Sequence, residues 1–179
     1  MEFAEDLAKL HDLKGSEFVV QLKSITADQG FHPRVTDPEI FTMGGEQDAD
    51  YENLIAAARK AVELGYTVYI LPNPRGIRTA DFIFVRKGIY RMYDLKTVQG
   101  KGSVGTQLMD SIGQCNRVLL NILSDYSGRL LASDIKTYFE KNGNAVEVFI
   151  MKGRKTISIN RIIALSPMFN RLFRRLYEK

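Results

Sequence analysis

Three polar residues at the ends of two expected strands have the types and the spacing that could hold a divalent cation beside a lysine. Asp94 and Lys96 are two positions apart within Ile89–Thr97, a stretch whose β-branched and aromatic residues predict a strand. Because side chains alternate between the two faces of a strand, Asp94 and Lys96 should leave the same face. Asp81 begins the preceding expected strand, Asp81–Val85.

The turn between these strands sets how the three side chains face one another. A two-residue turn at Lys87-Gly88 pairs Asp81 directly with Asp94, with Cβ atoms about 5 Å apart. Opposed carboxylates repel each other, and a divalent cation would offset that repulsion because hard cations prefer carboxylate oxygens. Such a cation activates water for hydrolysis, and a neighbouring lysine can orient the water or neutralise phosphate charge. We therefore expect a Mg²⁺ or Mn²⁺ site with Asp81 and Asp94 as ligands and Lys96 as a catalytic group. The alternative is a solvated sheet end where all three face water.

The elements that would position these residues alternate between helix and strand. Apolar residues at helical spacing predict a helix over Tyr51–Leu64, which Gly65 ends. The expected order from there is helix, three strands, helix, strand, which is a mixed α/β pattern around one central sheet with an αβββαβ core. The remaining core elements are the strand Thr67–Leu71, the helix Gly105–Gly113 and the strand Arg117–Leu123.

The residues before this core have a different character. Residues 3–12 predict a short amphipathic helix, and Phe18–Leu22 predicts a strand. Residues 27–50 are rich in glycine and proline with little periodicity, which favours an irregular connection. We therefore treat residues 1–50 as an N-terminal appendage, in the same domain or loosely attached, and residues 51–179 as the α/β domain.

The C-terminal residues carry an excess of positive charge. A helix is expected over Arg129–Lys141, then a hairpin formed by the strands Val146–Met151 and Thr156–Ile159, and a last helix that begins at Pro167. Residues 152–179 hold eight basic and one acidic side chain, whereas residues 1–63 hold six basic and thirteen acidic ones. A basic tail suits an anionic partner such as nucleic acid, and a solvated helix face is the alternative. The candidate nucleic-acid contacts in the last helix are Arg171, Arg174 and Arg175.

Two loops offer further basic residues near the expected site. Arg75 and Arg78 lie in the loop that leads to the Asp81 strand, and Lys101 lies in the glycine-rich loop Gly100–Gly105. These three are candidate phosphate contacts. The glycine spacing matches neither of the common phosphate-binding motifs of nucleotide-binding proteins, so a nucleotide-binding loop is not expected.

The motif Ala80-Asp81 followed by Asp94-Leu95-Lys96 resembles the signature of the PD-(D/E)XK nucleases, and the element order resembles their restriction-endonuclease-like core. Ala80 stands where that family often has proline. The resemblance implies a metal-dependent endonuclease. It also implies an acidic metal ligand on the first helix, best matched by Glu52, and a catalytic polar residue on the second helix, best matched by Gln114.

More narrowly, residues 52–122 resemble the C-terminal nuclease toxin domains of CdiA-type contact-dependent inhibition proteins. The matching features are Glu52-Asn53 at the start of a helix, Gly65-Tyr66 at its end, the Asp81 strand, and Gln114 before the apolar strand. Those toxins act on tRNA or DNA, so the resemblance implies a nucleic-acid substrate and an immunity or regulatory protein as a partner. A mobile-element nuclease is a second biological setting, and residues 1–50 match no family.

Composition excludes several other classes of protein. A single cysteine, Cys115, rules out an internal disulfide framework, and His11 and His32 have no ligand-like spacing with it. No stretch approaches the roughly 20 apolar residues that span a membrane. The N-terminal residues lack the basic start and apolar run of a secretory signal, so a cytoplasmic protein is expected.

Two other functions remain open from the sequence. The first is a metal-independent RNase toxin of the barnase, EndoU, colicin or RelE type, which would need a general acid and base. His11 and His32 both lie outside the region of resemblance, which counts against it. The second is a non-enzymatic nucleic-acid-binding module on a nuclease-like scaffold, which the basic C-terminal helix would suit.

Overall fold

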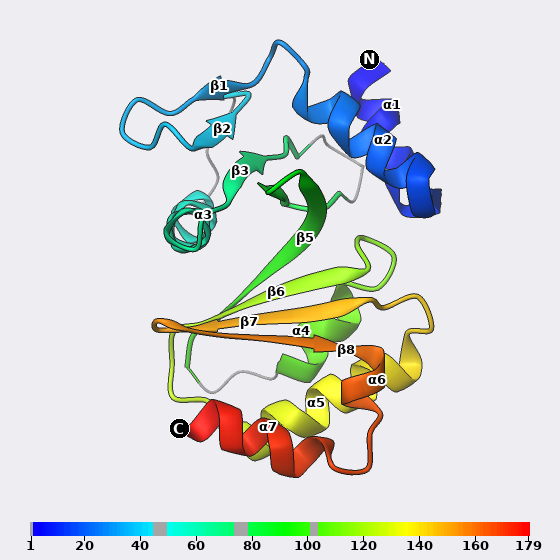
Figure 1. The fold of residues 1–179 in the computed structure, drawn as a ribbon, viewed down its shortest axis with the longest axis vertical. Coiled ribbons are helices and arrows are strands. Elements are labelled where there is room, and N and C mark those ends of the chain that lie inside the picture. The colour runs from blue at the N-terminus through cyan, green and yellow to red at the C-terminus, as the bar shows by residue number, and fades with distance from the viewer. Residues whose placement is uncertain (1, 45–49, 74–78, 101–103) are drawn as a thin grey trace. The chain divides into compact units, whose positions relative to one another are not determined.

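The computed structural model describes residues 2–44, 50–73, 79–100 and 104–179 (Figure 1). The chain divides into two compact units, Met1–Asp94 and Leu95–Lys179. The division falls inside one strand, so the expected site residues Asp94 and Lys96 lie on either side of it. Residues 1–50 belong to the same unit as residues 51–94.

The first unit is built on a mixed sheet with the strand order β1-β2-β3-β4-β5. The strands β2 and β3 are parallel, whereas the other neighbouring pairs in this part of the sheet are antiparallel. Their bounds are His32–Pro33 (β1), Ile40–Thr42 (β2), Thr67–Ile70 (β3), Phe82–Arg86 (β4) and Ile89–Val98 (β5). The two short strands β1 and β2 lie within residues 27–50, where an irregular connection was expected.

Three α-helices accompany the sheet in the described part of this unit. They are α1 (Glu2–Lys9), which continues into a 3-10 turn over Leu10–Asp12, α2 (Gly15–Thr26) and α3 (Tyr51–Glu63). Helix α3 confirms the expectation, and Gly65 follows it with a φ of 93°, a conformation that glycine adopts without strain.

The strand predicted over Phe18–Leu22 is wrong, because these residues lie in helix α2. The buried residues of this helix are Leu22 and Ile25, three positions apart, whereas the side chain of Val20 is 65% exposed. Burial on one side of a helix therefore decides the structure here, against the β-branched composition of the segment.

The loop between β1 and β2 is tied to helix α3 by one carboxylate. Asp37 accepts a hydrogen bond from Arg34 and a bidentate pair from Arg59, at 2.9 and 3.1 Å. The hydrogen bond from Arg59 is the main reason why the pKa of Asp37 lies well below its usual range, against the opposing effect of desolvation. This ion pair fixes the irregular segment against the helix.

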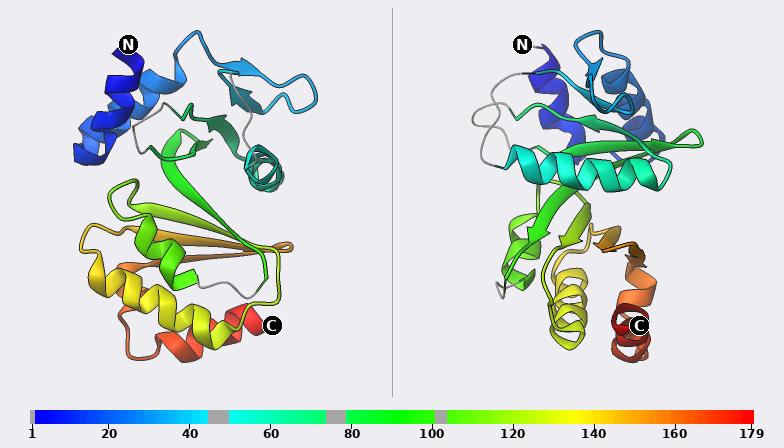
Figure 2. Two further views of the ribbon diagram at one scale, coloured as in Figure 1. Left: turned by 180° about the vertical axis from the view of Figure 1, so that it is seen from behind. Right: turned by 90° about the vertical axis from the view of Figure 1, so that its left-hand side faces the viewer.

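The second unit packs helices against one face of a three-stranded sheet (Figure 2). Its strands are β6 (Arg117–Ile122), β7 (Glu147–Lys152) and β8 (Lys155–Asn160), of which β6 and β7 are parallel and β7 and β8 antiparallel. Its helices are α4 (Val104–Asp110), α5 (Gly128–Lys141), α6 (Arg161–Ala164) and α7 (Phe169–Glu178). Strand β6 confirms the expected strand over Arg117–Leu123, and it is buried from Val118 to Ile122, so side chains on both of its faces are covered.

Two features of this unit differ from the expectation, an additional short helix and the start of the last helix. The short helix α6 follows β8 directly, and the side chain of Asn160 caps it by accepting a hydrogen bond from the amide of Ile163 at 2.9 Å. The last helix begins at Phe169 rather than at Pro167. The hairpin β7–β8 was expected and is confirmed.

The order α3-β3-β4-β5-α4-β6 confirms the expected α/β class and the αβββαβ order of elements. Within the part of the chain that the structure describes, no helix has both the length and the apolar character needed to cross a membrane.

Candidate active site

The hairpin of β4 and β5 carries the residues expected to do chemistry. Its cross-strand pairs run from Arg86–Ile89 at the turn to Phe82–Tyr93 at the far end. The turn residues Lys87 and Gly88 have φ values of 51° and 76°, which is the type I′ geometry that matches the twist of paired strands. The expected turn is therefore confirmed.

Asp81 lies one step beyond the last regular pair of this hairpin. Its amide donates a hydrogen bond to the carbonyl oxygen of Tyr93 at 3.0 Å, and its own carbonyl oxygen accepts one from the amide of Leu71 at 2.9 Å. Phe82 is already paired with Tyr93, so two successive residues oppose one, as in a β-bulge. The strand begins at Phe82, and Asp81 is bonded to the neighbour of Asp94 rather than paired with Asp94 as the simple register predicts.

Asp94 is a buried carboxylate. Its side chain is 4% exposed. Alternation along β5 puts it on the same face of the strand as Met92, which is 3% exposed, whereas Tyr93 is on the opposite face and packs on Phe84 with ring centroids 5.0 Å apart. A carboxylate that is removed from solvent needs hydrogen-bonding, ionic or metal partners to stabilise its charge. Asp94 is thus unlike the surface aspartates of a solvated sheet end.

Lys96 follows Asp94 by two residues on the uninterrupted strand β5 and is partly buried. Alternation along this one strand gives both side chains the same face, as expected. The expectation required that both residues belong to one strand, and that part is confirmed.

Two further expected site residues, one in each unit, lie on or next to a helix. Glu52 is exposed in the first turn of helix α3, where its negative charge adds to the effect of Asp37 in raising the pKa of Arg59. Helix α4 ends at Asp110, and Gln114 lies four residues beyond it. The backbone N–H of Gln114 donates a hydrogen bond to the carbonyl oxygen of Ser111 at 3.0 Å. The expected helix over Gly105–Gly113 is thus shorter than predicted, and the catalytic roles of Glu52 and Gln114 remain predictions.

A metal ion is often held by three or more acidic, histidine or cysteine side chains that lie close together. Among the residues that the structure describes, no three carboxylate, imidazole or thiol side chains come together as a metal-binding group. Asp81 and Asp94 thus stand as a pair of neighbouring candidates rather than as part of such a cluster.

The candidate phosphate contacts divide into two sets. Arg75, Arg78 and Lys101 lie outside the described residues. The other set, Arg171, Arg174 and Arg175, is exposed on helix α7, whose buried side is formed by Phe169, Phe173 and Tyr177.

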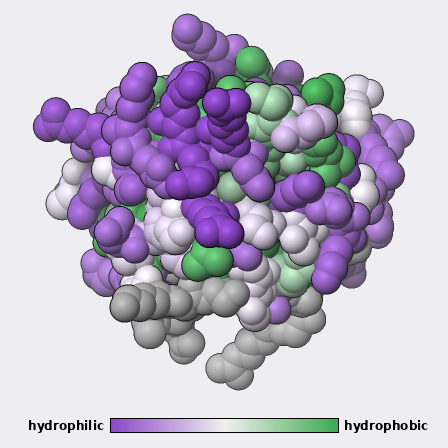
Figure 3. Space-filling view, turned by 90° about the horizontal axis from the view of Figure 1, so that it is seen from below, coloured by the Kyte–Doolittle hydropathy of each residue, from purple (hydrophilic) through white to green (hydrophobic). Residues whose placement is uncertain are grey.

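The three arginines of α7 differ in their surroundings. Arg174 forms an ion pair with Glu178 at 3.4 Å. Arg171 and Arg175 are one helical turn apart, and helical spacing puts them opposite the buried side. The view of the molecule from below shows hydrophilic side chains over much of that face, with hydrophobic groups between them (Figure 3).

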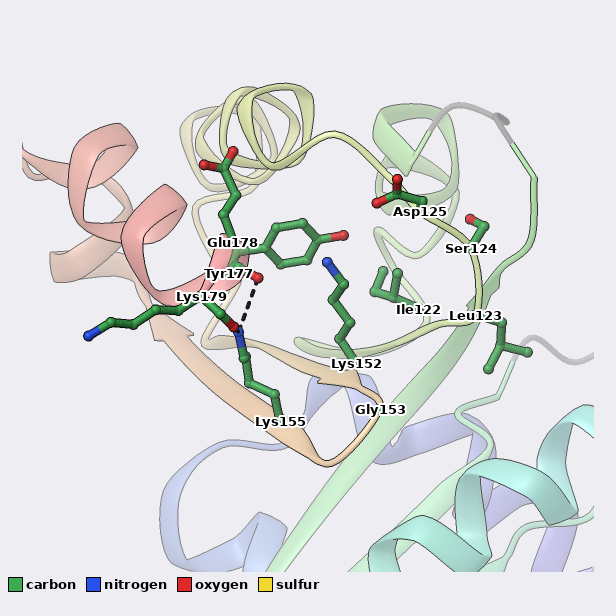
Figure 4. Close-up of a pocket in the computed structure, with 10 residues that line it drawn as sticks. All are labelled: Ile122, Leu123, Ser124, Asp125, Lys152, Gly153, Lys155, Tyr177, Glu178 and Lys179. Atoms are coloured by element: carbon green, nitrogen blue, oxygen red, sulfur yellow. Dashed lines mark hydrogen bonds between the residues drawn. The ribbon is translucent and has the colours of Figure 1, made fainter.

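A cavity of about 510 Å³ lies in the second unit, and nothing in the sequence analysis predicted it. Residues of β6 and the loop after it, of the β7–β8 turn and of the end of α7 line it, and they include Ser124, Asp125, Lys152, Lys155 and Tyr177 (Figure 4). The sequence holds one sign of this cavity, the two lysines Lys152 and Lys155 that flank the expected hairpin turn.

Comparisons with known proteins give one structural likeness. No family model matches the chain, and no curated protein matches it. One chain of a solved structure, "CdiA-CT/CdiI toxin and immunity complex from Burkholderia pseudomallei", is similar with 14% identity and a TM-score of 0.47. The match covers 68% of this chain and 98% of that chain. At that score the likeness carries no argument about function.

Proposed function

We propose that the chain is a metal-dependent nuclease that hydrolyses phosphodiester bonds of DNA or tRNA. The observation that supports it best is the burial of Asp94, which is 4% exposed beside a bulged hairpin end that carries a second aspartate, Asp81. A buried carboxylate is unfavourable unless it has partners that stabilise its charge, so a site for a cation is one physical reason to keep it.

The chemistry of the two carboxylates suits Mg²⁺ or Mn²⁺. Mg²⁺ is commonly held by one or two carboxylates together with water and the phosphate oxygens of the substrate, so Asp81 and Asp94 suffice in number. When bound, such an ion acts as a Lewis acid that stabilises the negative charge on the phosphate in the transition state, and it makes water a better nucleophile. Glu52 remains a proposed third ligand that would act directly or through water.

The other residues of the chain would bind and orient the substrate. In this proposal the ammonium group of Lys96 donates hydrogen bonds to the attacked phosphate or to the attacking water, from the same face of β5 as Asp94. The proposed roles of the arginines of α7 and of Gln114 are to hold the nucleic-acid backbone and to assist the site, respectively. Such groups act through position and charge, and they need no covalent intermediate.

The proposal is tested by incubating the protein with tRNA, single-stranded DNA and duplex DNA, each with Mg²⁺, with Mn²⁺ and with a chelator. We expect cleavage of at least one substrate with metal and none with chelator. The variant Asp94→Asn should be inactive, whereas Glu63→Gln, which changes an exposed acid on α3, should behave as the parent protein.

Each alternative gives a different result in the same experiment. Cleavage that persists in excess chelator would contradict the proposal and favour a metal-independent RNase. Salt-sensitive binding without cleavage under either metal would instead favour a binding module. A toxin-like or mobile-element setting and an immunity or regulatory partner belong to the same proposal and rest on the resemblance seen in the sequence. A cytoplasmic location is also proposed, on the character of the N-terminal residues.

A further inference from the structure

The turn between β7 and β8 gathers positive charge in an arrangement that is unfavourable by itself. Lys152 and Lys155 form the last cross-strand pair before the turn, which consists of Gly153 and Arg154. Paired residues of an antiparallel ladder have Cβ atoms about 5 Å apart on one face, and like charges in such a pair repel each other. Three cations among four consecutive residues therefore need compensation.

The two lysines turn their ammonium groups toward the same cavity (Figure 4). Lys152 Nζ lies 3.8 Å from the centroid of the Tyr177 ring, a cation–π contact. Lys155 Nζ donates to the backbone oxygen of Tyr177 at 3.2 Å and to that of Lys179. These contacts hold the two amines in place. Within the described residues, neither ammonium group is paired with a side-chain carboxylate.

The opposite wall of the cavity provides a hydroxyl group and a single carboxylate. The hydroxyl of Ser124 donates to a backbone carbonyl oxygen at 2.8 Å, so its position is fixed. Asp125 is exposed on the same loop, and its negative charge adds to burial, the larger cause, in raising the pKa of Tyr177. Glu178 is paired with an arginine of its own helix, and Lys179 extends its side chain away from the cavity (Figure 4). The lining thus carries the ammonium groups of Lys152 and Lys155 on one wall and the carboxylate of Asp125 on the other (Figure 4).

We propose that this cavity is a binding site for a phosphate group, carried either by a nucleic-acid backbone or by a free nucleotide. The volume of about 510 Å³ is that of a site for a small molecule or for one residue of a polymer. Phosphate oxygens accept hydrogen bonds from Lys152 and Lys155 and neutralise the cross-strand pair. The site lies wholly in the second unit and stands independently of the proposed nuclease reaction.

The test is a titration of the isotope-labelled whole chain with inorganic phosphate, followed by amide NMR, with potassium chloride of equal ionic strength as the reference. We expect saturable shifts at Gly153 and Ser124 with a dissociation constant on the order of 1 mM. Lys152→Gln should weaken binding at least about tenfold through the loss of a charge-assisted hydrogen bond. Lys152→Arg should keep it within a few-fold, and Lys141→Gln, an exposed lysine on α5, should leave it unchanged.

Two further ligands separate the sources of the phosphate. A single-stranded thymidine oligonucleotide without terminal phosphates that displaces inorganic phosphate identifies the polymer backbone as the ligand. Displacement by adenosine monophosphate but not by the oligonucleotide identifies a nucleotide. Shifts no larger than those with potassium chloride, or equal shifts in the folded Lys152→Gln protein, would overturn the proposal.

Discussion

The backbone amide of Asp81 donates a hydrogen bond to the carbonyl oxygen of Tyr93 at 3.0 Å. The hydrogen bonding between β4 and β5 therefore continues one residue beyond β4, to Asp81, and Tyr93 is the residue next to Asp94. Because Phe82 is also paired with Tyr93, the chain bends at Asp81 as at a bulge. Bulges redirect side chains and occur often beside active sites. The relationship ties the position of the Asp81 carboxylate to the register of the whole hairpin.

The first prediction concerns the two aspartates. Replacing Asp94 with asparagine keeps the size of the buried side chain but removes its charge, and we expect cleavage to fall by more than about 100-fold, since a metal ion contributes several kcal/mol to the transition state. Asp81→Asn should act in the same direction. Initial rates of cleavage with Mg²⁺ measure the effect. Unchanged rates in a folded Asp94→Asn protein would exclude this site.

The second prediction separates catalysis from binding at Lys96. Lys96→Ala should abolish cleavage while the affinity for uncleaved substrate, measured in the presence of chelator, falls only slightly, because the lysine acts mainly on charge that develops in the transition state. Lys87→Ala removes the same charge from the exposed hairpin turn and is the matched control. Equal rates for the two variants would show that Lys96 is not a catalytic group.

The third prediction concerns the turn that sets the register. Gly88 has a φ of 76°, and no heavy atom lies within 4 Å of the position that a Cβ atom would occupy, so the cost of Gly88→Ala is purely conformational. We expect a loss of about 1 kcal/mol in the free energy of unfolding, measured with urea. Gly143→Ala, at a loop position that is equally open and has no positive φ, should be neutral or slightly stabilising. An equal loss in both variants would contradict the turn geometry.

Local rules suffice for several features of the fold and of the candidate site. The turn at Gly88, the common face of Asp94 and Lys96, and helix α3 follow from the conformational preferences and periodicity of a few adjacent residues. The αβββαβ order follows from the sum of such elements. These features do not depend on contacts between residues that are distant in the sequence.

Features that depend on tertiary burial could not be predicted in this way. The segment Phe18–Leu22 has strand-like composition, yet it is helical because Leu22 and Ile25 are buried on one side. The regular strand register does not predict the bulge at Asp81, where the backbone N–H bonds to Tyr93 and the carbonyl oxygen accepts a hydrogen bond from Leu71, which follows β3. The cavity beside Lys152 depends on the end of helix α7, far along the chain.

The fourth prediction concerns the pH dependence of stability through Tyr177. Burial, together with the negative charge of Asp125 and the neighbouring Tyr126, raises the pKa of Tyr177 from 10.0 to about 12. A raised pKa in the folded state stabilises the protein fully below pH 10, and this stability is lost as the pH rises toward 12. Ultraviolet absorbance of tyrosinate should therefore show a late-ionising phenol that is absent from the titration of Tyr177→Phe, in addition to Tyr69 and Tyr126, whose pKa values burial also raises. That variant also loses the 2.8 Å hydrogen bond to the carbonyl oxygen of Tyr126, at a cost of about 1 kcal/mol.

The fifth prediction distinguishes the arginines of α7. Arg171 and Arg175 are exposed on the side of the helix opposite its buried residues, whereas Arg174 is paired with Glu178 at 3.4 Å. If this helix contacts the phosphate backbone, Arg171→Gln or Arg175→Gln should each lower the slope of log affinity against log salt concentration by about 1. Arg174→Gln should lower it less, because its charge is already partly neutralised within the helix. Fluorescence anisotropy with a labelled oligonucleotide across a salt series measures these slopes. Identical slopes for the parent protein and all three variants would mean that nucleic acid does not bind to α7.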